Sequence, residues 1–188
     1  METGNERVEA IAAATARDRA LIAALGGVAM DRPGDQLAAL LEAARTLEAA
    51  SIPYALIGGI AVGIYTSPRA TADVDVAAPT RVPRQELVSR LIAAGFTLSG
   101  EHEHSLNFRH PGGEPVQVAF DPEFDVMIDR AESLDVSGVT IRIVRREDLI
   151  AMKERAASDP ARRKSKALRD RADVELLRGD VEGPDEGW

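Results

Sequence analysis

Residues 54–76 constrain this chain more than any other segment. An apolar run before Gly58 predicts a strand, Gly58-Gly59 predicts a turn into a short helix, and a second predicted strand carries Asp73 and Asp75. Carboxylates two residues apart on a strand point to the same face. Two such charges repel each other unless a cation lies between them. With the glycine turn beside it, this pair indicates a divalent metal ion holding a phosphorylated ligand.

Each part of this pattern also has a plainer interpretation. Gly58-Gly59 could bring backbone N–H groups and a helix N-terminus close to a phosphate, but a tight turn that packs a strand against a helix uses the same residues. Asp73 and Asp75 could line a cleft or lie on a solvated edge strand, because an isolated Asp-x-Asp motif is not specific. The individual motifs therefore leave both alternatives open.

Arg69 and Thr71 precede the two aspartates at alternating positions. If the second strand begins early, all four side chains share one face. A cation and a hydroxyl beside two carboxylates suit a site for phosphate and metal. The alternative is an Arg–Asp ion pair that only neutralises the acids.

Composition limits the classes of function. The chain has 188 residues, with 45% hydrophobic and 29% charged residues, as in soluble globular proteins. It has no cysteine, which excludes disulfides, thiolate metal sites and a cysteine nucleophile. A net charge of -8 argues against a surface-wide basic field, so we expect no DNA partner. No apolar run approaches the ~20 residues of a membrane span, so we expect a cytoplasmic protein without a membrane partner.

Hydrophobic periodicity predicts a mixed α/β sheet with helices packed on it. We expect helices over residues 5–25, 36–50, 60–66, 84–94, 124–132, 146–155 and 164–178. We expect strands over residues 54–57, 72–77, 104–110, 115–120 and 139–144. These elements group into an N-terminal helical segment (1–34), a core (35–145), C-terminal helices (146–178) and a flexible tail (179–188).

The combination of motifs is more specific than its parts. Gly-Gly-x-Ala followed by Arg-x-Thr-x-Asp-x-Asp, within residues 58–75, resembles the signature of the nucleotidyltransferase superfamily of the DNA polymerase β type. Within that superfamily the chain is most similar to the AbiEii-like nucleotidyltransferases, many of which are toxins of toxin–antitoxin pairs. Residues 144–153 and 166–173 resemble the later motifs of the same family. The resemblance extends over roughly residues 36–178.

This resemblance implies a small mixed-sheet nucleotidyltransferase core with flanking helices and a C-terminal helical extension. It implies that Asp73 and Asp75 bind Mg²⁺ on a nucleoside triphosphate (NTP) and are catalytic. It places the backbone amides of Gly58 and Gly59 against the phosphates. Arg69 and Thr71 join them as predicted nucleotide-binding residues. A hydroxyl acceptor would attack the α-phosphorus in line as pyrophosphate leaves.

The later motifs add a cation and an acid. Lys153 matches the helical lysine of the family, which contacts the phosphates, and we count it among the predicted catalytic and nucleotide-binding residues. In the family, an acidic residue of the last helix pairs with this lysine, and Asp170 or Asp173 matches it here. Of the two, we predict that Asp173 belongs to the nucleotide site. The resemblance also suggests an antitoxin protein as a partner.

Gln117 departs from the family pattern. Many relatives carry a third carboxylate on the strand that here spans 115–120, where it acts as a base or completes the metal site. A glutamine can ligate through its carbonyl oxygen but cannot accept a proton at neutral pH. Asp121 could substitute as a metal ligand, or it could simply form the turn before Pro122. A catalytically degenerate protein that binds nucleotide or a partner protein is therefore an alternative to an enzyme.

The acceptor has more than one candidate. A basic run, Arg162–Lys166 with Arg169 and Arg171, could contact RNA, including tRNA, or could be a solvated helix start. Aminoglycoside nucleotidyltransferases share the Gly-Gly and Asp-x-Asp layout, so a small-molecule acceptor stays open. A structural or regulatory domain without nucleotide binding is the remaining interpretation. We interpret His102 and His104 as part of an exposed polar strand rather than a zinc site.

Overall fold

The computed structural model describes residues 4–24, 35–68 and 70–179. The chain divides into two compact units, residues 1–144 and 145–188. The first unit contains helices α1 (Gly4–Ala24), α2 (Gln36–Ala49), α3 (Gly58–Tyr65), α4 (Arg84–Ala93) and α5 (Pro122–Asp129). Its strands are β1 (Ala55–Ile57), β2 (Val74–Ala77), β3 (Thr97–His102), β4 (Ser105–Arg109), β5 (Pro115–Ala119), β6 (Glu132–Val136) and β7 (Val139–Ile143). The second unit contains α6 (Arg146–Ser158) and α7 (Lys164–Arg178).

The strands form one mixed sheet in the order β3-β4-β5-β2-β1-β7-β6. β2 pairs with β5, and β1 with β7, in parallel, whereas the other neighbouring strands are antiparallel. This architecture confirms the predicted mixed α/β fold. None of the helices in the described segments is long and apolar enough to cross a membrane.

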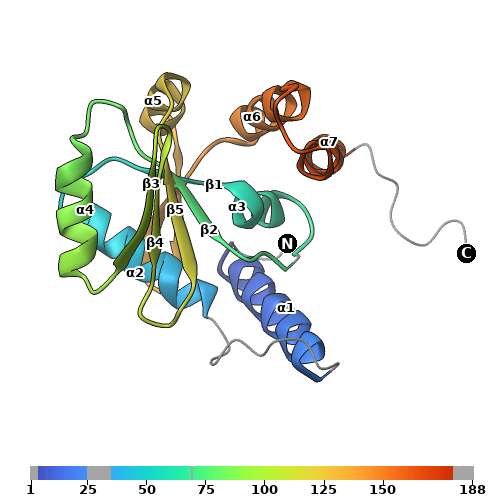
Figure 1. The fold of residues 1–188 in the computed structure, drawn as a ribbon. Coiled ribbons are helices and arrows are strands. Elements are labelled where there is room, and N and C mark those ends of the chain that lie inside the picture. Colours follow the sequence, from blue (N-terminus) through green and yellow to red (C-terminus); the bar gives the residue numbers. More distant parts are fainter. Residues whose placement is uncertain (1–3, 25–34, 69, 180–188) are drawn as a thin grey trace, which may run out of the picture. The chain divides into compact units, whose positions relative to one another are not determined.

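Alternation along the strands separates an apolar face from a polar one. On the apolar face, Val74 of β2 pairs with Val116 of β5, which in turn pairs with Phe108 of β4, and all three are at most 1% exposed. Helix α2 contacts β2 and β7, and α4 contacts β3 and α2 (Figure 1). Burial of these apolar side chains is the main stabilising term for the sheet. The neighbouring positions on each strand point to the opposite face.

A cluster of polar side chains around His110 ties the β4–β5 hairpin to α2. Both ring nitrogens of His110 face carboxylates: Nδ1 lies 2.7 Å from Oε2 of Glu114, and Nε2 lies 2.8 Å from Oε2 of Glu42. The Glu114 side chain is 0% exposed, and its other oxygen accepts a hydrogen bond of 2.6 Å from the backbone N–H of Asp35. His110 therefore has a structural role and is not one of a set of zinc ligands.

Strand β6 lies where the sequence predicted no strand, whereas β3 includes His102 of the exposed polar strand that the sequence predicted without giving its bounds. β3 has exposed or half-exposed positions throughout, and β6 has one buried position. Both are edge strands of the sheet, and most of their side chains are exposed or half-exposed, so no clear apolar alternation marks them. Two helices also begin earlier than expected, α3 at Gly58 and α5 at Pro122.

Candidate active site

The glycine turn lies directly against Asp75. Gly58 follows β1 and is the first residue of α3, with φ +70, a left-handed conformation that favours glycine. Ile57 pairs with Asp75 across the antiparallel β1–β2 ladder, which fixes the turn beside that carboxylate. A Cβ atom added to Gly58 would lie 2.1 Å from Oδ2 of Asp75. Both the backbone angle and the available space therefore require glycine here.

The start of α3 offers backbone donors. No side chain among the described residues caps this helix at Ile57. The first N–H groups of a helix lack partners within the helix, and they carry a partial positive charge that attracts anions. The second glycine, Gly59, lies close to Thr71, because an added Cβ would be 2.6 Å from the Thr71 Oγ1 atom. The structure thus brings Gly58, Gly59, Thr71 and Asp75 together.

The segment before β2 differs from the predicted strand. β2 begins at Val74, so Thr71 and Asp73 precede the strand and do not take part in the alternation that the sequence predicted for them. The backbone N–H of Thr71 instead donates to the Thr15 hydroxyl at 3.1 Å, which anchors this segment to α1. Arg69 lies outside the described residues.

Asp73 and Asp75 adjoin the polar face of the sheet. Asp73 is exposed and lines a hollow of about 240 Å³ together with Gln117, Asn107 and Arg109. Asp75 is half-buried and pairs with Gln117 across the parallel β2–β5 ladder, and Gln117 pairs with Asn107 across the β4–β5 ladder. Nε2 of Gln117 donates to Oδ1 of Asn107 at 3.1 Å. Gln117 therefore occupies the strand position directly beside Asp75.

Asp121 does not reach this site. Its side chain accepts a hydrogen bond of 3.0 Å from the backbone N–H of Glu123 and caps the start of α5. It follows the C-terminal end of β5, four residues beyond Gln117, which corresponds to about 13 Å along an extended chain. Asp73 lies at the opposite end of these parallel strands. The structure thus shows Asp121 in the turn before α5, which is the second of the two roles that the sequence allowed for it.

The carboxylates of Asp73 and Asp75 could together hold one metal ion that arrives with a phosphorylated ligand. Among the described residues, no group of three or more histidine or acidic side chains could hold a metal ion. His102 and His104 are exposed, the first at the end of edge strand β3 and the second in the following turn. Mg²⁺ is commonly held by one or two carboxylates together with phosphate oxygens of the substrate. Asp73 and Asp75 meet that requirement, but they do not form a complete protein cage.

In the second unit, Lys153 belongs to a buried ionic network. Its Nζ atom lies 2.9 Å from Oδ1 of Asp170 and 2.8 Å from Oδ2 of Asp173. These two carboxylate side chains are 3% and 2% exposed, and the Lys153 side chain is 15% exposed. Asp170 also accepts a hydrogen bond of 2.5 Å from Nε of Arg162. The predicted pairing of Lys153 with acids of the last helix is present, and it joins α6 to α7.

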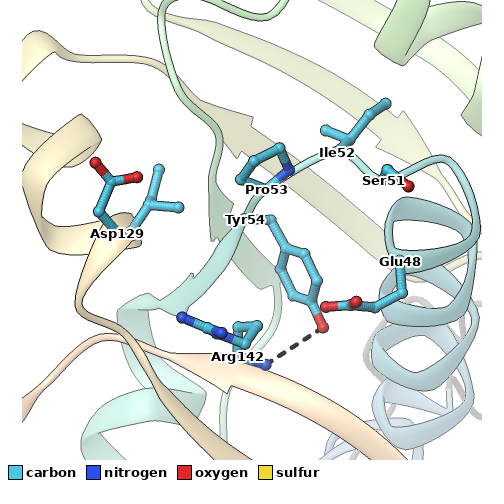
Figure 2. Close-up of a pocket in the computed structure, with 8 residues that line it drawn as sticks. Glu48, Ser51, Ile52, Pro53, Tyr54, Asp129 and Arg142 are labelled. Atoms are coloured by element: carbon cyan, nitrogen blue, oxygen red, sulfur yellow. Dashed lines mark hydrogen bonds between the residues drawn. The ribbon is translucent and has the colours of Figure 1, made fainter.

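A second hollow, of about 380 Å³, lies at the other end of β1. Figure 2 shows the Tyr54 hydroxyl between Glu48 and Arg142 in this hollow. The Tyr54 oxygen accepts a hydrogen bond of 3.3 Å from the backbone N–H of Arg142. Burial raises the pKa of Tyr54 from 10.0 to about 12. Because Tyr54 precedes β1 and Gly58 follows it, this hollow is separate from the glycine turn.

Comparison with known proteins agrees with this geometry. A family model described as a nucleotidyl transferase of unknown function matches residues 119–182. An antigenic nucleotidyltransferase-like protein from Paracoccidioides brasiliensis has a similar structure, with a TM-score of 0.55 and 22% identity over 79% of this chain and 78% of that chain. The fold is that of a nucleotidyltransferase.

Two antibiotic-modifying proteins share this nucleotidyltransferase fold. The antibiotic-resistance factor ANT(2'')-Ia has a TM-score of 0.54 and 17% identity, over 77% of this chain and 90% of that chain. The lincosamide antibiotic adenylyltransferase LnuA has a TM-score of 0.50 and 14% identity, over 73% of this chain and 92% of that chain. The search of curated proteins finds no match.

Asn107 and the cluster around Glu114 are the site and core residues that sequence reasoning missed. Ser105, Asn107 and Arg109 alternate with the buried Leu106 and Phe108, and this pattern could have marked a polar sheet face. It could not have shown that Asn107 pairs with Gln117, because the β4–β5 register decides that contact.

Proposed function

We propose that this chain is a Mg²⁺-dependent nucleotidyltransferase that moves a nucleoside monophosphate from an NTP to a hydroxyl acceptor. The acceptor oxygen would form a bond to the α-phosphorus, the bond from that phosphorus to the bridging oxygen would break, and pyrophosphate would leave. The observation that carries this proposal is the packing of Gly58 against Asp75, next to the uncapped start of α3. It puts the N–H groups of a helix start and a carboxylate in one place, which supports binding of a phosphate group and a metal ion there.

Each residue has a distinct role in this proposal. Asp73 and Asp75 would hold Mg²⁺, which when bound neutralises the charge of the triphosphate. The N–H groups of Gly58 and Gly59 would bind phosphate oxygens, because neither residue has a side chain that would block their approach. Thr71 would orient the ligand beside Gly59.

Three further assignments rest on the sequence resemblance. Arg69 would contribute a cation to the nucleotide site. Lys153 would contact the phosphates, and Asp173 would hold it in place. An ammonium group has three N–H donors, and Lys153 donates one of them to Oδ1 of Asp170, so donors remain for a phosphate oxygen.

RNA is the acceptor that the charge distribution favours. Residues 145–179 contain eleven Lys and Arg residues against seven Asp and Glu residues, although the whole chain carries a net charge of -8. Five basic residues at the start and along the surface of α7 are exposed, namely Arg163, Lys164, Lys166, Arg169 and Arg171. Basic side chains of this kind bind phosphate backbones. The acceptor could be tRNA.

The hollow near Asp73 argues against a polycationic antibiotic as acceptor. It is lined by one carboxylate, Asp73, and one guanidinium group, Arg109. A ligand carrying several ammonium groups requires more negative charge than this to offset its desolvation. An aminoglycoside-type acceptor is therefore the weaker form of the proposal.

A test combines each of the four labelled NTPs with Mg²⁺ and either total RNA or an aminoglycoside mixture. We expect label to be transferred to RNA, and the Asp75→Asn variant to lose this transfer by at least a hundredfold. Asp129→Asn is the matched control, because Asp129 is an exposed acid of α5 that pairs with Arg81. Transfer to the antibiotics alone would refute the RNA acceptor, and equal transfer by wild type and Asp75→Asn would refute the proposed site.

We also propose that the chain acts as an AbiEii-type toxin that an antitoxin protein neutralises. The support is the sequence resemblance over residues 58–75 and 144–173. Controlled expression in a bacterial host would test it. We expect growth arrest with the wild-type chain and normal growth with Asp75→Asn, and arrest by both would contradict a toxic activity of this site.

A catalytically degenerate nucleotide-binding protein is the second candidate. Gln117 motivates it, because an amide beside Asp75 cannot take the proton of a hydroxyl acceptor. Calorimetric titration with Mg-ATP and Mg-CTP, combined with a pyrophosphate-release assay, separates the two candidates. Binding without release supports the degenerate protein, and release that Asp73→Ala abolishes refutes it.

A further inference from the structure

We propose that Thr15 of α1 is a positioning residue of the active site. Its hydroxyl holds the backbone of Thr71 and thereby sets where Thr71 and Asp73 lie relative to the glycine turn. The proposal rests on the nucleotidyltransferase function proposed above. It gives a role in that function to α1, which precedes residues 36–178, the part of the chain that resembles the family.

The segment that carries Thr71 and Asp73 has no regular structure of its own. Residues 70–73 belong to neither a helix nor a strand. The Thr71 hydroxyl nevertheless has a defined place at the start of α3, because a Cβ atom added to Gly59 would lie 2.6 Å from its Oγ1 atom. Segments with few regular hydrogen bonds open more easily than helices and strands. The position of residues 70–73 therefore depends on contacts that other elements supply.

The hydroxyl of Thr15 supplies such a contact to both backbone polar groups of Thr71. Its Oγ1 atom accepts a hydrogen bond of 3.1 Å from the Thr71 N–H and lies 3.3 Å from the Thr71 carbonyl oxygen. A hydroxyl has one proton to donate and two lone pairs that accept. It can therefore accept from Thr71 while it donates its proton to the carbonyl oxygen of Thr71 or to that of Ile11, which lies at 3.0 Å.

The place of Thr15 on α1 indicates that packing alone does not require a hydroxyl there. Val8, Ile11 and Thr15 follow one another at helical spacing and are at most 3% exposed. Valine has nearly the shape of threonine and would fill the same space without a polar atom. A buried hydroxyl costs free energy unless it is hydrogen-bonded, and the partner of this one outside α1 is Thr71.

Helix α1 also holds α3, the helix that begins at the glycine turn. The two helices are in contact (Figure 1). A guanidinium N–H of Arg7 donates to the carbonyl oxygen of Ile64 in the last turn of α3, where carbonyl groups lack partners within the helix. One helix thus fixes both α3 and the Thr71 segment. Residues that support ligands of a metal or phosphate from behind orient them in this way.

The test is calorimetric titration of the full chain with a non-hydrolysable ATP analogue and Mg²⁺. We expect Thr15→Val to weaken binding of the analogue by about tenfold, because valine cannot accept the Thr71 N–H. Binding should also need more Mg²⁺, since the same contact sets the position of Asp73. Thr15→Ser keeps the hydroxyl and should restore most of the affinity. Equally weak binding by Thr15→Ser and Thr15→Val would overturn the role of the hydroxyl.

Thr46→Val is the matched control. The Thr46 hydroxyl donates at 2.7 Å to the carbonyl oxygen of Glu42, four residues earlier in α2, as the Thr15 hydroxyl can to that of Ile11. The control therefore removes a hydroxyl from a helix without removing an acceptor for Thr71. We expect Thr46→Val to bind the analogue like the wild type, and equal affinity of Thr15→Val and Thr46→Val would overturn the proposal.

Two measurements separate positioning from a general loss of stability. A lower fraction of folded chain reduces the stoichiometry of the titration, whereas a misplaced segment lowers the affinity of the chains that are folded. Amide hydrogen exchange of the wild-type chain provides a test that needs no variant. We expect the Thr71 amide to exchange at least about tenfold more slowly than an exposed amide. Exchange as fast as that of an exposed amide would overturn the proposal, even if Thr15→Val does not fold.

Failure of this inference is distinguishable from failure of the proposed function. If the wild-type chain does not bind the analogue with Mg²⁺, or if Asp75→Asn binds it equally well, the proposed function itself fails. If Asp75→Asn loses binding while Thr15→Val binds like Thr46→Val, only the role of Thr15 is refuted.

Discussion

Replacing Lys153 with methionine tests the ionic network that joins α6 to α7. Methionine keeps most of the length of the side chain but removes the ammonium group. Asp170 retains its hydrogen bond from Arg162, whereas Asp173 loses the cation 2.8 Å from its Oδ2 atom. Removing one partner of a buried ion pair costs about 3–5 kcal/mol, because the remaining charge stays out of water. With carboxylates that are 3% and 2% exposed, we expect a loss in that range.

Native-state hydrogen exchange measures this loss within α6 and α7 themselves. A destabilisation of about 3–5 kcal/mol corresponds to exchange that is faster by roughly two to four orders of magnitude. Lys166→Met is the matched control, because Lys166 is an exposed lysine in the first turn of α7. Substitutions of this kind change stability by about 0.5 kcal/mol or less. A second change, Asp173→Asn, should recover part of the loss in the Lys153→Met background, since it removes a buried negative charge that the ammonium group no longer offsets.

Comparable exchange in Lys153→Met and Lys166→Met would refute the structural role of Lys153. Nucleotide affinity, measured on the same variants, tests its predicted contact with phosphates. If Lys153→Met/Asp173→Asn regains stability but still binds Mg-ATP at least tenfold more weakly than wild type, Lys153 has both roles. If the double variant regains both stability and affinity, its predicted contact with the phosphates is wrong.

Three further predictions concern residues of the first unit. Gly58→Ala should lower Mg-ATP affinity at least tenfold in calorimetric titration, because the added Cβ would lie 2.1 Å from Oδ2 of Asp75, and unchanged affinity would contradict this packing. His110→Leu removes the imidazole beside the fully buried Glu114 and leaves one of its oxygens without a hydrogen-bond partner. This should lower the free energy of unfolding in urea by about 1–3 kcal/mol, and a loss under about 0.5 kcal/mol would contradict it. Folding raises the pKa of the Tyr54 hydroxyl from 10.0 to about 12. At a pH between these two values, the hydroxyl is therefore mostly ionised in the unfolded chain and mostly neutral in the folded chain. The free energy of unfolding should therefore fall as the pH rises through that range, and it should fall less in Tyr54→Phe. An equal dependence on pH in the wild-type chain and in Tyr54→Phe would refute the raised pKa of Tyr54.

The sequence predicted elements well where one face of an element is buried. Helix α7 has the predicted bounds of 164–178, and α2 ends one residue before its predicted end. In both helices, apolar or charged residues recur at the spacing of a helical turn, and this pattern can be recognised within the segment itself. The edge strands β3 and β6 carry little of this signal, because most of their side chains are exposed or half-exposed. Their existence depends on pairing with neighbours, which is a tertiary interaction.

Within the candidate site, the sequence predicted which residues lie near one another better than it predicted their backbone. It grouped the glycine turn with Thr71 and Asp75, and the structure places Gly58 against Asp75 and Gly59 against Thr71. It could not show where β2 begins, so the alternation expected for Thr71 and Asp73 was wrong. It also left two roles for Asp121, and the cap of α5 decided between them.

The sequence by itself determined the mixed α/β class and the glycine–aspartate motif, because residue types and their spacing carry both. Only the tertiary structure decided that Ile57 pairs with Asp75 and that Gln117 lies between Asp75 and Asn107. Strand order and register set these contacts, and they depend on how distant segments pair rather than on any local pattern. The glycine turn therefore indicated a phosphate site, and the sheet decided which side chains could complete it.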